Sequence, residues 1–363
     1  MVTKQTARLP PMRYKRVLVV TKQTAYESYS RLKQQGRAPK AVRWERLRNR
    51  FDVHKQCVED CLAELRRAGV PRFEVISRED LDRQDLEGVD LVVAVGGDGT
   101  ALSASHFVRS GDVPVLGVNS DPTRPWEAEV VKRLDERRSY GALCGCSAND
   151  MREIIPRVVA GDVHPEPRAR IRARVRGTLS ETRLPPALND LLVAHPIPAA
   201  VSRFRLDKLA ARGAPSGGFE GFNVWSSGMW VASPTGSTAA MHAAGGTPVE
   251  DKMSKDLQYM VREHLVDDDA EAAEAAVLAR GRGTLEDGER LRLRWNSQHG
   301  RVWVDGAHVS FDLELGDQLE IDGLAPPLLV FPSPHEHART LRRMKRPVEA
   351  AIARTAAPLD VKL

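Results

Sequence analysis

The chain has 363 residues, enough for two domains of ordinary size, and 42% of them are hydrophobic while 28% are charged. This composition excludes a largely disordered chain, and no apolar run approaches the roughly 20 residues that a membrane-spanning helix needs, so we expect a soluble protein without a membrane partner. The net charge of +5, from 54 lysines and arginines against 49 aspartates and glutamates, suits a small polyanionic ligand but is too weak to indicate DNA or RNA.

The cysteines indicate neither a disulfide scaffold nor a zinc site. They are few for a chain of this size and lack the paired spacing of zinc ligands, at Cys57, Cys61, Cys144 and Cys146. We therefore expect unreactive thiols in a reducing compartment. No apolar leader is visible at the start, so the cytosol is the expected location, and Val361-Lys-Leu363 only loosely resembles a peroxisomal address.

The first half of the chain alternates between predicted strands and helices. Short apolar runs of strand length lie at residues 14–20, 73–76, 90–95 and 113–118. Apolar residues at helical spacing between Val58 and Ala68 predict a helix that ends at Gly69, and residues 101–108 predict another. This alternation is typical of an α/β domain with an open parallel sheet, which we place at residues 1–150.

Beyond residue 150 the pattern changes to alternation with a period of two. Arginines alternate with small apolar residues from Arg168 to Arg176, which predicts a strand with one thin apolar face and a solvated arginine face. Further short strands, separated by Asp-Gly and Gly-Asp turns, are predicted at residues 291–295, 302–304, 311–315 and 319–321. We therefore expect a β-rich second domain at residues 151–333, followed by a basic helix or tail at 334–363.

A glycine-rich turn follows the buried strand at residues 90–95. Its sequence is Gly96-Gly97-Asp98-Gly99-Thr100. Glycines let a backbone approach a ligand closely, and the N–H groups of the turn and of the helix after it favour phosphate oxygens. A carboxylate inside an anion-binding turn suggests a chemical role, and Asp98 is placed to accept a proton from an attacking hydroxyl. The alternative is a tight turn in which Asp98 only caps the helix.

Two common nucleotide-binding motifs are absent. No G-x-x-x-x-G-K-[ST] sequence occurs, which disfavours a P-loop fold. A dinucleotide fingerprint of the G-x-G-x-x-G type would need glycine at position 102, where the chain has Leu102, which disfavours a hydride-transfer fold.

Two further segments carry groups suited to a nucleoside. Asn189-Asp190 joins an amide to a carboxylate, and a carboxylate accepts hydrogen bonds from sugar hydroxyls. A later apolar run ends in small and hydroxyl-bearing residues that allow a flat ligand close to the backbone: Thr235, Ser237, Thr238 and Ala239. Taken alone, the first segment is equally compatible with a turn and the second with a Ser/Thr-capped helix.

Together, these three segments resemble the NAD kinase family in order and approximate spacing, and Asp305-Gly306 also fits. The plant-type NADH kinase branch is the most similar. The segments that resemble it lie at residues 117–123, 189–196, 200–204 and 256–263. The resemblance extends from about residue 14 to 333. The glycine-rich turn alone is shared with phosphofructokinases and with diacylglycerol and sphingosine kinases. The resemblance to the NAD kinase family therefore rests on the three segments together.

The resemblance implies an α/β nucleotide-binding domain, a β-rich dinucleotide-binding domain, and transfer of the ATP γ-phosphoryl group to the adenosine 2′-hydroxyl of NADH or NAD⁺. It implies Mg²⁺ or another divalent metal, with unknown ligands, and a homo-oligomer such as a dimer. Asp98 matches the catalytic carboxylate, and its glycine-rich neighbours would hold ATP. The residues that match the dinucleotide site are Asn189, Asp190, Ser227, Thr235, Ser237, Thr238 and Ala239.

Two positions depart from the wider family pattern. Ser227 stands where most NAD kinases have aspartate, and Ala240 stands where many have tyrosine. A carboxylate beside the nicotinamide would attract oxidised NAD⁺ more than neutral NADH. We therefore hypothesise that Ser227 relaxes selection for NAD⁺ and lets NADH compete.

Two other functions stay open at this point. A lipid kinase would share the glycine-rich turn, but the Asn-Asp pair and the hydroxyl-rich segment disfavour it. A non-catalytic NADP(H) sensor would keep the pocket without turnover, and the presence of Asp98 disfavours that function.

Overall fold

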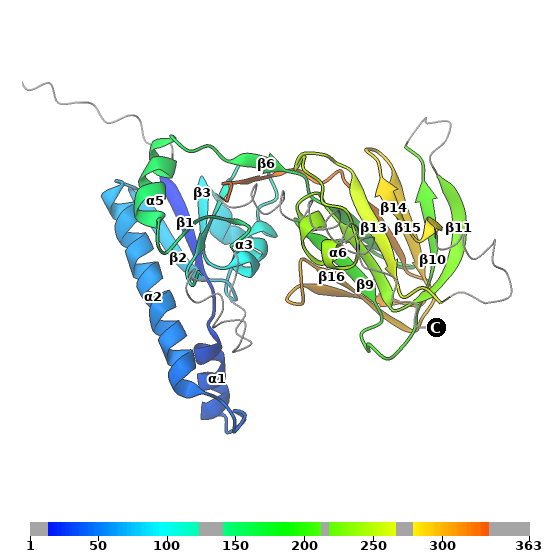
Figure 1. Ribbon diagram of the computed structural model, residues 1–363, viewed down its shortest axis with the longest axis horizontal. Coiled ribbons are helices and arrows are strands. Elements are labelled where there is room, and N and C mark those ends of the chain that lie inside the picture. The colour runs from blue at the N-terminus through cyan, green and yellow to red at the C-terminus, as the bar shows by residue number, and fades with distance from the viewer. Residues whose placement is uncertain (1–13, 123–140, 212–217, 266–278, 334–363) are drawn as a thin grey trace, which may run out of the picture. The chain divides into compact units, whose positions relative to one another are not determined.

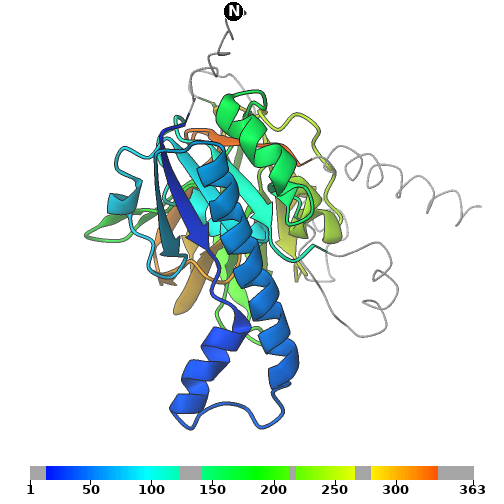
Figure 2. The same ribbon diagram turned by 90° about the vertical axis from the view of Figure 1, so that its left-hand side faces the viewer.

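The computed structural model describes residues 14–122, 141–211, 218–265 and 279–333 (Figures 1 and 2). The described residues divide into two compact units, one made of residues up to Glu166 together with those from Leu328 onward, and one that extends from Pro167 to Pro327, and each is considered by itself. The expected boundary at residue 150 falls just before a helix that belongs to the first unit. The basic segment expected at 334–363 lies outside the described residues.

The first unit contains the predicted parallel sheet. The strand order is β2-β1-β3-β4-β19-β6, with β5 beside β4. The pairs β1–β2, β1–β3, β3–β4, β4–β5 and β4–β19 are all parallel. The strands are β1 (Arg16–Thr21), β2 (Arg72–Ser77), β3 (Leu91–Gly96), β4 (Val115–Asn119), β5 (Cys144–Ser147), β6 (Glu166–Arg168) and β19 (Leu328–Val330). All six residues of β3 are buried, as expected for a central parallel strand covered on both faces.

The helices of this unit are α1 (Ala25–Gln34), α2 (Trp44–Arg67), the 3₁₀ helix η1 (Arg83–Leu86), α3 (Asp98–Ser105) and α5 (Met151–Ala160). Of these helices, α2 and α5 contribute buried apolar residues to the core beside the sheet, α3 packs on β3 and β4, and α1 packs on α2. The predicted helix at residues 58–68 is the second half of the longer α2, the longest helix in Figure 2. This helix buries Cys57, Cys61 and Leu65. The chain leaves α2 at Gly69, whose φ of 81° is left-handed and favours glycine.

The cysteines are buried free thiols, as predicted. Burial raises the pKa of both Cys57 and Cys61 to about 12, so neither forms the reactive thiolate near neutral pH.

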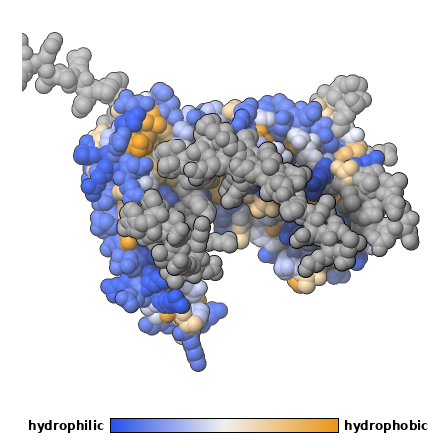
Figure 3. Space-filling view, viewed as in Figure 1, coloured by the Kyte–Doolittle hydropathy of each residue, from blue (hydrophilic) through white to orange (hydrophobic). Residues whose placement is uncertain are grey.

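No helix in the described ranges is both long and apolar enough to cross a membrane. Figure 3 shows mostly polar side chains where α1 and α2 face the viewer.

The second unit is the predicted β-rich domain, built from two antiparallel sheets. Their strand orders are β11-β10-β15-β18-β7-β8 and β14-β13-β12-β9-β16-β17. The strands are β7 (Arg172–Arg176), β8 (Glu181–Arg183), β9 (Asp190–Ala194), β10 (Ser202–Leu209), β11 (Phe219–Ser226), β12 (Gly228–Ala232), β13 (Leu257–Arg262), β14 (Arg282–Leu285), β15 (Arg290–Trp295), β16 (His299–Val304), β17 (Ser310–Glu314) and β18 (Gln318–Asp322). Side chains from both sheets share one apolar core, in which Trp295 stacks on Phe204.

The arginine-rich strand is not the solvated face that its sequence predicts. Arg168 and Arg170 are fully buried, and the Nε of Arg170 donates to the carbonyl of Pro326 at 2.8 Å. Arg172 on β7 forms an ion pair of 2.7 Å with Asp322 on the neighbouring β18. The alternation itself holds in β7, where Ala173 and Val175 are buried and Arg176 is exposed. The solvated face is wrong for Arg168 and Arg170, because they are buried, and incomplete for β7, because β18 supplies opposite charges.

Candidate functional site

The glycine-rich turn joins β3 to α3 without any intervening loop. Gly97 is the N-cap residue and Asp98 is the first residue of the helix, three positions before the predicted start. A Cβ atom on Gly96 would lie 2.1 Å from Oγ1 of Thr100, so only glycine fits there. Thr100 is buried and supports the turn from inside, whereas Gly99 is exposed and has open space beside it.

Asp98 is held in place by a neighbouring strand connection. Its Oδ1 accepts a hydrogen bond of 2.8 Å from the backbone N–H of Leu143, directly before β5. The carboxylate therefore belongs to the carboxyl edge of the parallel sheet, which is where ligands bind in open α/β folds.

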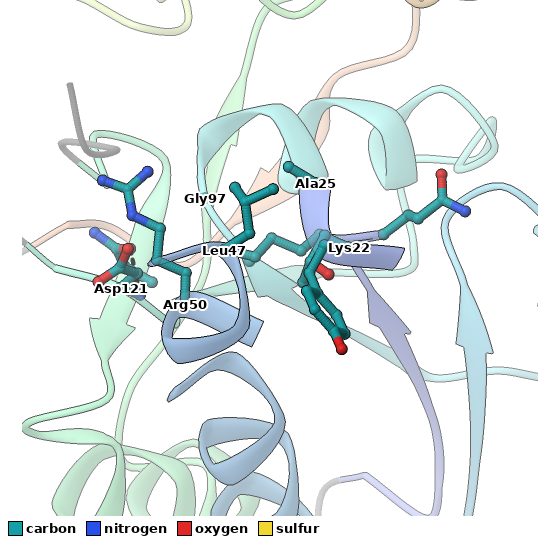
Figure 4. Close-up of a pocket in the computed structure, with 11 residues that line it drawn as sticks. Lys22, Ala25, Leu47, Arg50, Gly97 and Asp121 are labelled. Atoms are coloured by element: carbon teal, nitrogen blue, oxygen red, sulfur yellow. Dashed lines mark hydrogen bonds between the residues drawn. The ribbon is translucent and has the colours of Figure 1, made fainter. Parts of the chain in front are cut away.

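A pocket of about 250 Å³ opens beside this turn (Figure 4). It is lined by the ends of three parallel strands and by α1 and α2, through residues Lys22, Gln23, Thr24, Ala25, Tyr26, Leu47, Arg50, Gly96, Gly97, Asn119 and Asp121. Figure 4 shows Arg50 and Asp121 on the same side of the pocket, with Lys22 across from them. Burial lowers the pKa of Lys22, while the negative charge of Asp121 opposes that shift. Sequence reasoning did not find these cations, because Lys22 and Arg50 belong to different elements.

A buried histidine lies on α2 one turn after Arg50, which lines the pocket. His54 on α2 has its Nδ1 3.0 Å from Oγ of Ser120, which follows β4. Burial lowers the pKa of His54 to about 4, and the positive charge of Lys22 contributes to this shift. His54 is therefore neutral at physiological pH and connects α2 to the edge of the sheet where the glycine-rich turn lies.

In the second unit, the Asn-Asp pair lies beside the hydroxyl-rich segment. The strands β9 and β12 are neighbours, with Asp190 opposite Ala232. The N–H of Ser233 donates to the carbonyl of Asn189 at 2.9 Å, and a Cβ on Gly236 would lie 1.9 Å from that carbonyl oxygen. The segment thus packs its backbone directly on Asn189.

Asp305 fixes the backbone of the Asn-Asp pair. Its carboxylate accepts hydrogen bonds from the N–H groups of Leu188 at 2.8 Å, Asn189 at 2.6 Å and Asp190 at 3.0 Å. Asp305 has a φ of 52°, a left-handed conformation that aspartate tolerates better than most residues. The Asp-Gly pair is therefore more than a hairpin turn, since it also orients the residues opposite it.

Two polar groups at this end of the second unit have no partner among the described residues. Asp190 is 8% exposed, and burial, followed by the nearby charge of Asp305, raises its pKa to about 7. Oγ1 of Thr235 is buried without a hydrogen-bond partner. Buried polar groups are normally satisfied, so these two groups are candidates for ligand contacts.

The other residues of the hydroxyl-rich segment differ in their surroundings. Ser237 is fully buried; its hydroxyl donates to the carbonyl of Pro234 at 2.7 Å and accepts from the N–H of Val249 at 2.9 Å. Thr238 is half-buried, and Ala239 is exposed. They lie in the 3₁₀ helix η3 (Gly236–Thr238) and just before the short helix α6 (Ala240–Ala243). Ser237 therefore shapes the segment, while Thr238 and Ala239 remain accessible.

Ser227 is not part of this cluster. It precedes β12, whereas Ser233 follows it, and six residues of extended chain separate the two by roughly 20 Å. The hydroxyl of Ser227 instead donates to Oε2 of Glu263, directly after β13. Among the described residues, no group of three or more histidines, cysteines, aspartates or glutamates is arranged to hold a metal ion.

Comparison with known proteins connects these features to one family. Residues 9–121 match the family model of the ATP-NAD kinase N-terminal domain. The chain is 40% identical over 295 residues to a probable NADH kinase of Oryza sativa subsp. japonica, covering 80% of this chain and 85% of that protein. It is 37% identical over 286 residues to an NADH kinase of Arabidopsis thaliana, covering 78% of this chain and 85% of that protein.

Two solved structures have a similar fold. One is an NAD kinase from Archaeoglobus fulgidus in complex with ATP, with a TM-score of 0.58, 18% identity, and coverage of 91% of this chain and 98% of that one. The other is yeast NADH kinase complexed with NADH, with a TM-score of 0.59, 15% identity, and coverage of 96% and 91%. At these identities the likeness concerns the fold.

Proposed function

The chain belongs to the NAD kinase family, and we propose that it transfers the γ-phosphoryl group of ATP to the adenosine 2′-hydroxyl of NADH and NAD⁺. The products are NADPH and NADP⁺. Relatives named NADH kinase and a fold shared with ATP-bound and NADH-bound kinases support the two substrates.

The observation that carries the proposal is the pocket beside the glycine-rich turn. Phosphate oxygens need N–H donors and cations, and this pocket offers the backbone of Gly96 and Gly97 together with Lys22 and Arg50. Phosphoryl transfer depends mainly on positioning and on compensating the negative charge of the phosphates. We assign the phosphates of ATP to this pocket.

Asp98 is proposed to accept the proton of the 2′-hydroxyl as that oxygen attacks the γ-phosphorus. The hydrogen bond from Leu143 orients the carboxylate without neutralising it. General-base assistance of this kind is worth about 10²- to 10⁴-fold in rate. Gly99 and Thr100 complete the turn that holds Asp98 at the N-terminus of α3.

In the second unit we assign adenosine and its ribose to the end of β9 and β12. The carboxylate of Asp190 would accept hydrogen bonds from ribose hydroxyls, and Thr235 would offer its unpaired hydroxyl. Asn189, Thr238 and Ala239 line the same end, and Ser237 supports them from inside. Asp305 holds Asn189 and Asp190 in position by accepting hydrogen bonds from their backbone N–H groups.

A divalent metal fits the pocket in the first unit. Mg²⁺ keeps several waters and takes its protein ligands as one or two oxygens, since the nucleotide phosphates supply the rest. Asp121 lines the pocket, and the Oδ1 of Asn119, which also lines it, accepts a hydrogen bond from the N–H of Asp121 at 3.3 Å. The carboxylate of Asp121 would hold such an ion, which would neutralise phosphate charge.

We further propose that this protein forms a homo-oligomer and acts in the cytosol.

Steady-state turnover tests the proposal. Purified protein with Mg-ATP should convert NADH to NADPH and NAD⁺ to NADP⁺, while Asp98→Asn should lower kcat at least about a hundredfold and retain dinucleotide binding. The asparagine keeps an oxygen acceptor for the N–H of Leu143, so the melting temperature should change little. Phosphorylation of a lipid in micelles, with no dinucleotide turnover, would instead indicate a lipid kinase, and binding without turnover would indicate a sensor.

A further inference from the structure

Ser227 lies beside a carboxylate that comes from a different strand. It directly precedes β12, and Glu263 directly follows β13, the antiparallel neighbour of β12. In the register of these strands Gly228 lies opposite Arg262, so Ser227 and Glu263 come side by side although 36 positions separate them. The hydroxyl of Ser227 donates to Oε2 of Glu263.

The backbone of Glu263 is unusual. Its φ is 37°, and among the described residues only Glu263 and Asp305 have a positive φ without being glycine. Left-handed backbone disfavours a side chain such as glutamate, and such strain is concentrated at functional sites. Asp305 already orients the dinucleotide site proposed above, which makes the same conformation at Glu263 an independent indication of a role in binding.

The carboxylate of Glu263 is accessible to a ligand. Its side chain is 70% exposed, and Nε of Arg262 lies 3.8 Å from Oε2, a distance at which the two charges offset each other only in part. Glu263 also lines a pocket of about 460 Å³ together with Val261, Gly281 and Arg282. A negative charge therefore stands at the wall of a cavity large enough for a nicotinamide ring.

The cavity and the groups assigned to adenosine lie at opposite ends of β12. The groups assigned to adenosine lie beyond Ala232, at the opposite end of β12. A carboxylate beside Ser227 can therefore meet the nicotinamide end of a dinucleotide but not the ribose that receives the phosphoryl group. The hypothesis drawn from Ser227 alone assumed that no carboxylate is present, whereas Glu263 provides one.

We propose that Glu263 supplies, from β13, the carboxylate that Ser227 lacks, and that its charge sets the preference between oxidised NAD⁺ and neutral NADH. This inference rests on the proposed kinase function. Attraction between a carboxylate and the nicotinamide cation at a partly exposed site amounts to a factor of about three to eight in relative kcat/KM. The chain would then accept both substrates, with Glu263 favouring NAD⁺.

The test compares kcat/KM for NAD⁺ and NADH in the wild type and in Glu263→Gln. The variant keeps the size of the side chain and an oxygen acceptor for Ser227, so only the charge is removed. We expect kcat/KM for NAD⁺ to fall about three- to eightfold and that for NADH to change less than about twofold. Glu314→Gln, which removes an exposed carboxylate at the end of β17, is the matched control and should leave the ratio unchanged.

A second variant separates the charge from a structural role. Adding Ser227→Asp to Glu263→Gln restores a carboxylate one strand away and should return the ratio toward NAD⁺. An unchanged ratio in Glu263→Gln, or an equal loss for both substrates that Ser227→Asp does not rescue, would overturn the proposal. Absence of turnover in the wild type would instead contradict the kinase function, and calorimetric dissociation constants for NAD⁺ and NADH would then make the same charge comparison.

Discussion

Replacing Asp190 with asparagine should make the protein more stable at high pH. Burial and the charge of Asp305 raise the pKa of Asp190 from 3.8 to about 7, so the fold favours the protonated acid. Each tenfold change in an acid's ionisation equilibrium corresponds to about 1.4 kcal/mol, which gives an upper bound of about 4 kcal/mol for the destabilisation by ionised Asp190 above pH 7. Asparagine carries no charge at any pH and avoids this destabilisation.

The pH dependence gives the sign of the effect. Well below the unfolded pKa of 3.8, Asp190 is protonated in both the folded and the unfolded chain, and the destabilisation is absent. It grows as the unfolded chain ionises and the folded chain does not, and it levels off near pH 7. Between about pH 5.5 and pH 8 the stability gained by Asp190→Asn should therefore increase by about 2 kcal/mol.

Urea unfolding of the ligand-free wild type and variant at several pH values between about 5.5 and 8 measures this difference. The free energy of unfolding should differ most at the highest pH, and the variant should bind NADH and NAD⁺ more weakly because the ribose loses a charged acceptor. A difference that does not change with pH would refute the assignment of a raised pKa to Asp190. A variant less stable than the wild type at the highest pH would show that the ionised carboxylate has a partner that stabilises it.

Two further substitutions examine the same end of the second unit. Gly236→Ala should lower the free energy of unfolding by about 1–3 kcal/mol, because the new Cβ would lie 1.9 Å from the carbonyl oxygen of Asn189. Gly177→Ala is the control and should cost less, because the atom nearest to its Cβ is a side-chain oxygen 3.2 Å away. Asp305→Asn should cost about 2 kcal/mol, since the amide has one acceptor oxygen in place of two for three N–H donors. Chemical denaturation measures both, and in Asp305→Asn the pH-dependent gain from Asp190→Asn should become smaller, because the charge of Asp305 contributes to the raised pKa of Asp190.

The parts of the structure that sequence predicted well are contiguous in the chain. The buried strand, the glycine-rich turn and the helix after it follow one another, so their arrangement depends on local geometry. The two classes of sheet were also predictable, since a continuous apolar run and a period of two are typical of buried parallel and half-buried antiparallel strands. The helix start was placed three residues late, because the glycines concealed that Asp98 is already helical.

The parts that sequence did not predict depend on register between distant segments. Lys22 and Arg50 come to one pocket only once β1 and α2 have packed together. The alternating arginines predicted a solvated face, yet Arg170 is fully buried and Arg172 meets a carboxylate 150 positions away. The same limitation applies to Ser227, whose departure from the family pattern indicated a missing charge that a different strand provides.

Asp190 and Asp305, at the end of β9, have different roles because they receive different hydrogen bonds from the backbone. Asp305 is buried, but three backbone N–H groups compensate its charge, and its role is to hold the Asn-Asp pair in position. Asp190 is similarly buried and receives no such donors from the described residues, so the protein alone leaves its ionised form unfavourable. Ribose hydroxyls would supply the missing donors, and binding would then be linked to loss of a proton near pH 7. The charge that destabilises the empty fold is for that reason the one that a dinucleotide can stabilise most.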